Sequence, residues 1–162
     1  MLNFTILPAY EYKKEIKSLF EEYTTMLIEN DGAFAGYLKL QNYDDELEHL
    51  EKKYGLPGGR LYIAFAGGAA AGCVAIRKID GGSCELKRLY VRPQFRYNGL
   101  GRMLLEKAVG EARAAGYKQM LLDTLPFLQS ALKMYRAYGF YETEPHGYSP
   151  MATSIYMRLD LK

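Results

Sequence analysis

The sequence predicts a mixed α/β protein of the α+β class, with a central, mostly antiparallel sheet of about six to seven strands flanked by about four helices. Two observations carry this prediction. Three strand-like segments joined by short turns occupy residues 60–91, which is typical of antiparallel hairpins. After Pro93 the apolar period changes to 3.6, and helical segments then alternate with strand-like ones. The second half should therefore add strand–helix–strand units to the sheet.

The N-terminal third contains one strand and two helices. Leu2–Leu7 alternates between apolar and polar residues, which predicts a short strand. Glu11–Glu29 carries apolar residues at helical spacing and predicts an amphipathic helix. Ala33–Asn42 is rich in aromatic residues and contains glycine, so we expect a loop there. Asp44–Tyr54 predicts a second, shorter helix.

The middle of the chain predicts three strands in quick order, at Arg60–Ala66, Ala71–Lys78 and Ser83–Val91. Glycine-rich dipeptides separate them and predict hairpin turns. A long helix follows, because Leu100, Leu104, Ala108 and Ala112 make one apolar face that ends at Gly116.

The C-terminal part predicts a strand at Lys118–Asp123 and a helix at Gln129–Tyr138. Gly139 should end that helix, since glycine readily adopts the positive φ of a helix C-cap. A strand should begin at Phe140, and Ser154–Leu159 alternates as the last strand.

Composition narrows the class of protein. The chain has 162 residues, of which 49% are apolar and 25% charged, so we expect one domain over residues 1–162. A net charge of +2 is too small to indicate nucleic-acid binding. Cys73 and Cys84 lack CxxC spacing and lie in apolar segments, which predicts buried free thiols. His49 and His146 are the only histidines, so no metal site is expected.

We also expect a cytoplasmic protein with no membrane partner. Met1–Pro8 lacks the charged start and the apolar run of a signal peptide. No apolar stretch of the sequence is long enough to span a bilayer.

The most informative segment runs from Glu85 to Arg102 and reads as a strand, a tight turn with Gly99 and Gly101, and a helix start. Such a turn directs several amides at one spot, and the helix dipole adds partial positive charge there. Arg96 and Arg102 can add charge-assisted hydrogen bonds. The turn therefore predicts a phosphate or pyrophosphate site. The dinucleotide fingerprint fails because position 104 is Leu, and no Gly-Lys-Ser/Thr follows.

The fuller pattern is Val91-x-Pro93-x-x-Arg96-x-x-Gly99-x-Gly101-x-x-Leu104. It resembles the CoA-binding motif of the GNAT superfamily, the acetyl-CoA-dependent N-acetyltransferases. A second match, Ala131-x-x-x-Tyr135-x-x-x-Gly139-Phe140, lies at the family's usual separation. The order of predicted elements also resembles the GNAT fold along nearly the whole chain. The resemblance implies acetyl-CoA as cosubstrate and transfer of its acetyl group to a primary amine by direct attack.

The resemblance also implies which residues hold the cosubstrate. The backbone of Leu89, Tyr90 and Val91 would bind the pantetheine arm, in a gap between two splayed parallel strands. The amides from Arg96 to Arg102 would hold the pyrophosphate. This second group comprises Arg96, Tyr97, Asn98, Gly99, Leu100, Gly101 and Arg102. One departure is Leu128, which stands where family members often have a pantetheine-binding Asn.

Three candidate catalytic residues follow from the same resemblance. Tyr135 matches the tyrosine that serves the departing thiolate; the alternative is a core aromatic on an amphipathic helix. Glu85 is the first candidate base and Asp123 the second, since an amine of pKa about 10 must lose a proton before it attacks. The apolar neighbours of Glu85 in sequence would raise its pKa, although pairing with Lys87 is the alternative. An ordered water could replace either carboxylate.

The acceptor stays open at this stage and is either a small-molecule amine or a peptide amine. The segments around Asn30–Asp44 and Glu142–Ser154 are those that choose the acceptor in the family, and they carry Tyr37, Tyr148 and His146. A homodimer is a family-level expectation. The alternative function is a non-catalytic acyl-CoA-binding regulatory module, and a purely structural interaction domain is the third hypothesis.

Overall fold

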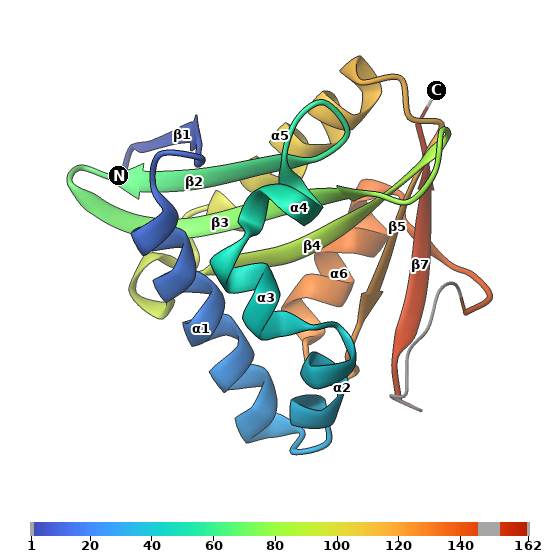
Figure 1. Ribbon diagram of the computed structural model, residues 1–162, viewed down its shortest axis with the longest axis horizontal. Helices are drawn as coiled ribbons and strands as arrows, with labels where there is room; N and C mark the ends of the chain where they lie inside the picture. Colours follow the sequence, from blue (N-terminus) through green and yellow to red (C-terminus); the bar gives the residue numbers. More distant parts are fainter. Residues whose placement is uncertain (1, 146–152, 162) are drawn as a thin grey trace.

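The computed structural model describes residues 2–145 and 153–161, and its centre is a seven-stranded sheet of order β1-β2-β3-β4-β5-β7-β6 (Figure 1). Only the β4–β5 pair is parallel among the strand pairs of the described residues. The predicted mixed, mostly antiparallel sheet is therefore confirmed. The strands are β1 (Phe4–Pro8), β2 (Arg60–Ala66), β3 (Ala69–Lys78), β4 (Ser83–Val91), β5 (Gln119–Thr124), β6 (Tyr141–Glu142) and β7 (Ile155–Asp160).

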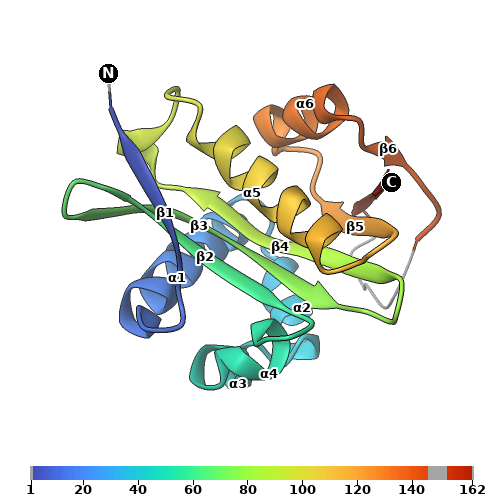
Figure 2. The same ribbon diagram turned by 90° about the horizontal axis from the view of Figure 1, so that it is seen from above.

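Helices cover both faces of the sheet. Figure 2 shows α5 and α6 on one face and α1 to α4 on the other. A short 3-10 turn, Pro93–Phe95, precedes α5. The helices are α1 (Lys13–Asn30), α2 (Phe34–Leu40), α3 (Tyr43–Glu48), α4 (Leu50–Tyr54), α5 (Leu100–Ala114) and α6 (Gln129–Tyr138).

The helix count is the main difference from the sequence prediction. The loop expected at Ala33–Asn42 is wrong, because that stretch contains α2. Phe34 and Leu38 lie one helical turn apart and pack into a small core with Leu27 and Leu125, and this burial outweighs the weak helix propensity of the segment. The predicted helix at Asp44–Tyr54 is split into α3 and α4 by the non-helical backbone of His49.

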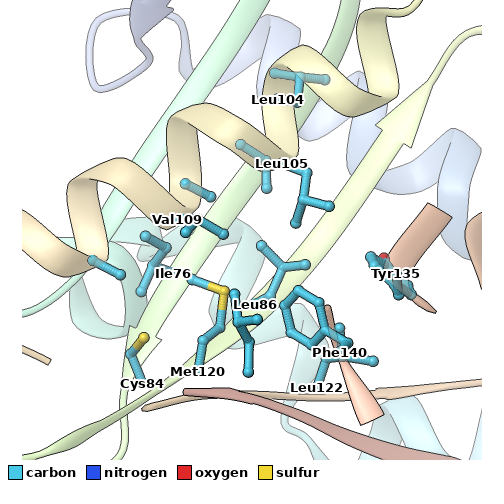
Figure 3. Close-up of a cluster of buried hydrophobic side chains, with 14 of the residues drawn as sticks. Ile76, Cys84, Leu86, Leu104, Leu105, Val109, Met120, Leu122, Tyr135 and Phe140 are labelled. Atoms are coloured by element: carbon cyan, nitrogen blue, oxygen red, sulfur yellow. The ribbon is translucent and has the colours of Figure 1, made fainter. Parts of the chain in front are cut away.

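Two apolar layers hold the helices on the sheet. One layer lies under α5 and α6 and contains Leu104, Val109, Met120 and Phe140 (Figure 3). The other lies under α1 and α4. Cys73 and Cys84 are buried free thiols, as predicted, one in each layer.

Helix α6 ends as the sequence predicts. Gly139 has φ of 123°, and its amide donates to the carbonyls of Tyr135 and Arg136. This positive φ lets the chain turn back at once, so that Phe140 enters the core just before β6.

Strands β4 and β5 diverge along their length. Their parallel pairing covers only Ser83 to Glu85 on β4, opposite Gln119 to Leu121 on β5. Beyond these residues β4 continues to Val91 and β5 to Thr124 without pairing to each other. The gap expected between these two strands is thus present in the fold.

Candidate active site

The turn before α5 has a backbone arrangement suited to an anion. Tyr97 and Gly99 have φ of 65° and 80°, which curls the chain between the 3-10 turn and the helix. The amides of residues 97 to 102 donate no hydrogen bond to any described residue. Unpaired amides at a helix N-terminus attract phosphate oxygens, through their own dipoles and through the helix dipole. The seven residues predicted for pyrophosphate binding include all six of these amides.

The side chains of the turn are arranged less simply than the sequence suggests. Arg96 donates from Nε to the carbonyl of Val91 at 3.0 Å, which leaves its terminal nitrogens for a ligand. Asn98 donates to the carbonyl of Arg96 at 2.9 Å and holds the turn in shape. Tyr97 is fully exposed. Arg102 lies 5.4 Å over the ring of Tyr138, so it joins the first turn of α5 to α6.

The end of β4 offers backbone groups to the gap. The amide of Arg92 donates to the carbonyl of Ala71 on β3, so the backbone of Arg92 faces β3. Successive residues of a strand point their backbone groups to opposite sides. The groups of Val91 and Leu89 therefore face the gap, whereas Tyr90 pairs with Cys73. Of the three strand residues predicted to bind pantetheine, Leu89 and Val91 thus face the gap with their backbone, although the carbonyl of Val91 accepts from Arg96.

A groove of about 450 Å³ runs from the anion-binding turn along the gap. We call it the groove. It is bordered by the end of β4, the start of α5 and one side of α6, and its lining includes Val91, Arg96, Gly99, Gly101, Leu128 and Tyr135. Leu128 gives the groove an apolar wall, and Gln129 uses its side-chain amide to bond the carbonyl of Pro126. We find no side chain at these two positions that reproduces the missing Asn.

Two further cavities continue from the groove. A small one of about 40 Å³, the junction cavity, shares Tyr23, Leu89, Leu128 and Tyr135 with the groove. A larger one of about 640 Å³, the outer pocket, shares Tyr37, Gln41, Lys87 and Asp123 with the junction cavity. The three cavities therefore adjoin one another in a row beside the gap between β4 and β5, with the junction cavity in the middle.

Tyr135 lies where the groove meets the junction cavity. Its ring is buried and packs on Phe140 at a centroid distance of 5.6 Å (Figure 3). Its hydroxyl has no hydrogen-bond partner in the described part of the chain. Burial raises the pKa of Tyr135, and Tyr23 and Asp123 nearby raise it further. The hydroxyl therefore stays protonated and can donate a proton or a hydrogen bond.

Asp123 lies at the opposite side of the junction cavity, near the end of β5. Tyr37 donates from its hydroxyl to Oδ2 of Asp123 at 3.0 Å. The same carboxylate borders the outer pocket. Burial, with Asp123 as the second cause, raises the pKa of Tyr37, so this phenol remains the donor in the pair.

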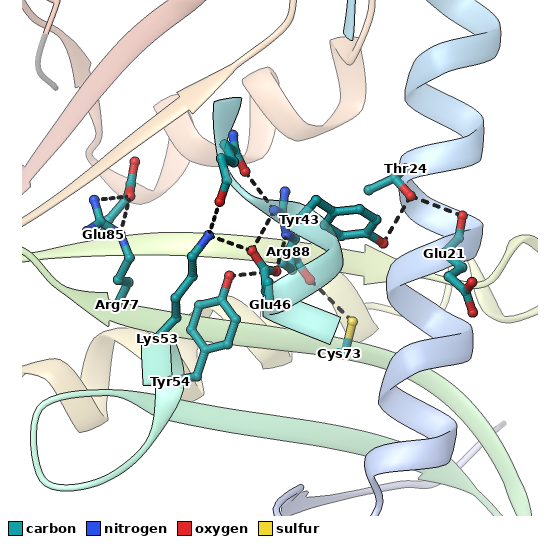
Figure 4. A network of polar contacts seen from close by, with 11 residues as sticks. Glu21, Thr24, Tyr43, Glu46, Lys53, Tyr54, Cys73, Arg77, Glu85 and Arg88 are labelled. Atoms are coloured by element: carbon teal, nitrogen blue, oxygen red, sulfur yellow. Dashed lines mark hydrogen bonds and ion pairs between the residues drawn. The ribbon is translucent and has the colours of Figure 1, made fainter. Parts of the chain in front are cut away.

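Of the three cavities, Glu85 borders only the outer pocket, and its carboxylate pairs with a different cation from the Lys87 considered in the sequence analysis. Arg77, opposite Glu85 on β3, donates to Oε1 from Nε at 3.0 Å and from Nη2 at 2.9 Å (Figure 4). The apolar neighbours Cys84 and Leu86 point to the other face of the sheet, into the core under α5. The expected apolar surroundings of the Glu85 carboxylate are therefore absent, and its described cation partner is Arg77 rather than Lys87.

A buried ion pair ties the helices beside the outer pocket to β4. Glu46 of α3 accepts from Nε of Arg88 at 2.9 Å and from Nζ of Lys53 at 2.8 Å (Figure 4). Arg88 also donates to the side chain of Gln41 at 2.7 Å. Arg88 has φ of 56° and sits where the β3–β4 register shifts, which marks a β-bulge.

Sequence reasoning missed several residues that border the cavities. Tyr23 of α1 and Gln41 at the end of α2 come from helices far from the motifs in sequence. Lys87 was considered only as a partner of Glu85, yet it borders both the junction cavity and the outer pocket. The alternation of β4 already put Lys87 and Glu85 on one face, and that signal could have located it. The predicted acceptor-side residues His146 and Tyr148 lie outside the described residues.

Neither a membrane-spanning helix nor a metal site accompanies these cavities. Across residues 2–145 and 153–161, none of the helices combines the length and apolarity needed to cross a bilayer. In the same residues no three His, Cys, Asp or Glu side chains gather as metal ligands would.

Comparison with known proteins assigns the family. Residues 40–140 match the model of the acetyltransferase (GNAT) family. An uncharacterised N-acetyltransferase of Schizosaccharomyces pombe is 40% identical, covering 91% of this chain and 87% of its own. An IAA acetyltransferase of Azospirillum brasilense is 35% identical, covering 90% of this chain and 95% of its own. The chain belongs to the acetyltransferase (GNAT) family, whose members transfer an acyl group from acyl-CoA to an acceptor.

Solved structures show the same fold. A GNAT-family acetyltransferase of Staphylococcus aureus superposes with a TM-score of 0.77 at 20% identity, covering 99% of this chain and all of its own. The acetyltransferase yncA of Salmonella typhimurium, solved with acetyl-CoA, has a TM-score of 0.68 at 20% identity, covering 98% of this chain and 94% of its own.

Proposed function

We propose that this enzyme transfers the acetyl group of acetyl-CoA to a primary amine, by direct attack while both substrates are bound. The observation that carries the proposal is the row of three adjoining cavities, in which Tyr135 borders the groove and the junction cavity and Asp123 borders the junction cavity and the outer pocket. The N-acetyltransferase names of the relatives support it and favour an enzyme over an acyl-CoA-binding regulatory module.

The residues present fit acetyl-CoA. The unpaired amides of residues 97 to 102 suit a pyrophosphate, and Arg96 and Arg102 add positive charge beside them. The backbone of Leu89 and the amide of Val91 suit a pantetheine arm lying in the gap between β4 and β5, whereas the carbonyl of Val91 accepts from Arg96. Acetyl-CoA supplies an acetyl group activated as a thioester.

The side chains of the protein must support two proton transfers, one from the acceptor amine and one to the departing thiolate. An ammonium of pKa about 10 must lose a proton to become a nucleophile, and a thiolate gains from a proton as it leaves. We assign Asp123 to the first task, because it borders both the junction cavity and the outer pocket. We assign Tyr135 to the second, because its raised pKa keeps the hydroxyl protonated beside the groove. Glu85 ranks below Asp123, since it borders only the outer pocket and is held by Arg77.

We further propose a single domain and a cellular location for the enzyme. One domain over residues 1–162 accords with the single sheet that all described helices cover. Two free buried thiols are compatible with a reducing compartment, so we propose the cytoplasm. A homodimer stays a prediction.

Two measurements test the function. Acetyl-CoA should stabilise the folded protein by about 2.7 kcal/mol at a hundredfold excess over its Kd, measured as a rise in melting temperature. Incubation with acetyl-CoA and a panel of amines, including polyamines, aminosugars, amino acids and peptides, should release free CoA thiol only when an acceptor is present. A protein that binds acetyl-CoA yet acetylates no amine would be the regulatory module, and one that ignores acetyl-CoA would contradict the proposal entirely.

A further inference from the structure

One buried cation beside the junction cavity has no partner in the described chain. Lys87 is only 9% exposed, and its ammonium makes no hydrogen bond or ion pair with residues 2–145 or 153–161. It nevertheless borders both the junction cavity and the outer pocket, and its ammonium is accessible, because no fully buried side-chain nitrogen in the described residues lacks a hydrogen-bond partner. Buried charges in proteins are normally paired, and an unpaired one beside a cavity indicates a ligand group of opposite charge.

Three other cations at the outer pocket, Lys52, Lys53 and Arg77, are paired with carboxylates, whereas Lys78 makes no ion pair with the described residues but is exposed rather than buried. Lys53 lies 2.8 Å from Oε1 of Glu46, and Arg77 lies 2.9 Å from Oε1 of Glu85. Asp123 influences Lys87 electrostatically but forms no ion pair with it within 4.0 Å. Lys87 is therefore a buried ammonium of the outer pocket with no paired carboxylate in the described residues, and Asp123, which accepts from the hydroxyl of Tyr37, is a carboxylate of the same pocket that makes no ion pair there.

The surroundings of Lys87 leave room for one more negative charge. Burial lowers the pKa of Lys87; Glu85 opposes the shift and Arg88 adds to it. An anion next to the ammonium would offset this cost of burial. Three carboxylates, those of Glu85, Asp123 and Glu46, already lie within electrostatic reach of Lys87, so a singly charged carboxylate suits the site better than a doubly charged phosphate.

We propose that Lys87 binds a carboxylate of the acceptor, and that the acceptor is a small zwitterionic amine of the amino-acid class. This assignment rests on the proposed function, because it takes the outer pocket as the place of the acceptor. Its volume, about 640 Å³, lies in the usual range of small-molecule sites. With its carboxylate on Lys87, the acceptor can place its ammonium at Asp123, and two fixed contacts orient the amine toward the junction cavity.

The first experiment uses the wild-type enzyme. A panel of α-amino acids and ω-amino acids is compared with the matching carboxamides, which keep the amine and remove the negative charge. We expect kcat/KM for the best amino acid to exceed that for its carboxamide about tenfold to a hundredfold, as for a charge-assisted hydrogen bond. Equal rates, or activity confined to polyamines and aminosugars, would overturn the assignment while leaving the acetyltransferase function standing.

The second experiment compares Lys87→Met with Lys39→Met, which removes the same charge from an exposed lysine of α2 that borders none of the three cavities. Lys87→Met should raise the KM for the amino acid about tenfold to a hundredfold and leave that for the carboxamide unchanged. Lys87→Arg should retain most of the discrimination. Lys39→Met should match the wild type.

A binding measurement tests the binding of CoA and the role of Lys87 separately. With CoA present at saturation, the amino acid should raise the melting temperature of the wild type and of Lys39→Met, but not that of Lys87→Met. If CoA itself stabilises none of these proteins, the proposed function fails. If CoA stabilises all three and the amino acid stabilises Lys87→Met as much as the wild type, only the role of Lys87 is refuted.

Discussion

The buried pair of Glu46 and Arg88 permits a quantitative prediction. The side chain of Glu46 is fully buried, and it is contacted by Arg88 at 2.9 Å, by Lys53 at 2.8 Å and by the hydroxyl of Tyr54 at 2.9 Å. Burial alone would raise the pKa of Glu46, but Arg88 and Lys53 outweigh it and lower the pKa from 4.5 to about 2. The folded protein therefore favours the charged carboxylate.

The change Glu46→Gln tests this pair, because it keeps the shape of the side chain and removes its charge. A pKa lowered by about 2.5 units corresponds to about 3 kcal/mol, at 1.36 kcal/mol per unit. Breaking a buried ion pair by removing one partner costs about 3–5 kcal/mol, which agrees. We expect the free energy of unfolding to fall by about 3 kcal/mol at pH 7, measured by urea denaturation.

The sign of the pH dependence follows from the direction of the shift. Because the folded-state pKa of Glu46 is depressed, its contribution is fully present above the unfolded-state value near 4.5 and is lost as pH falls toward about 2. The difference between wild type and Glu46→Gln should therefore narrow steadily below pH 5. The control is Glu48→Gln in the same helix, whose exposed pair with Lys17 at 3.4 Å should contribute at most about 1 kcal/mol. The reasoning fails if both variants are equally stable at pH 7, or if the Glu46→Gln deficit is independent of pH.

Three further predictions concern the active site. Tyr135→Phe should lower kcat and kcat/KM together, on the order of a hundredfold, and keep the fold, because only a hydroxyl is removed; a raised KM for acetyl-CoA at constant kcat would contradict this. Gly101→Val should abolish most of the thermal stabilisation by CoA without destabilising the protein that has no CoA bound. A Cβ at position 101 would lie 3.7 Å from the sulfur of Met134, so the added side chain fits the fold but occupies the groove. Normal CoA binding by calorimetry would locate the phosphate site elsewhere. Asp123→Asn should lower kcat about a hundredfold, and this loss should shrink at high pH because more of the amine is then already deprotonated. Glu85→Gln should lower kcat by less. If Glu85→Gln lowered kcat more than Asp123→Asn, Glu85 would be the base.

Short-range patterns of the sequence predicted most of the architecture. The hairpins, the helix after Pro93 and the glycine turn each depend on residues within a few positions of one another, and all are present in the fold. Helix α2 was missed because its stability comes from burial of Phe34 against distant segments, which no local pattern records. The same limit applies to Arg77 and Glu85, which pair through a strand register.

The β-bulge at Arg88 is a second feature that the sequence did not predict. Strict alternation would put Leu86 and Leu89 on opposite faces of β4, yet both pack on the layer under α5. The extra residue therefore changes which side chains near Lys87 border the junction cavity. Hydrophobic periodicity does not predict the position of such an irregularity.

The two cysteines have a practical consequence for every assay described above. Cys73 and Cys84 are fully buried, and burial raises the pKa of both thiols, that of Cys84 to about 12. A chromogenic disulfide reagent attacks through thiolates, so the native enzyme should leave it colourless and the signal should come from released CoA. When the same reagent is added without substrate, the rate at which the two thiols react measures how fast the fold opens and exposes them. Cys73 and Cys84 lie in the apolar layers on opposite faces of the sheet, so each single Cys→Ala variant leaves one reactive thiol. Its reaction rate would report on the opening of the layer that contains the remaining cysteine.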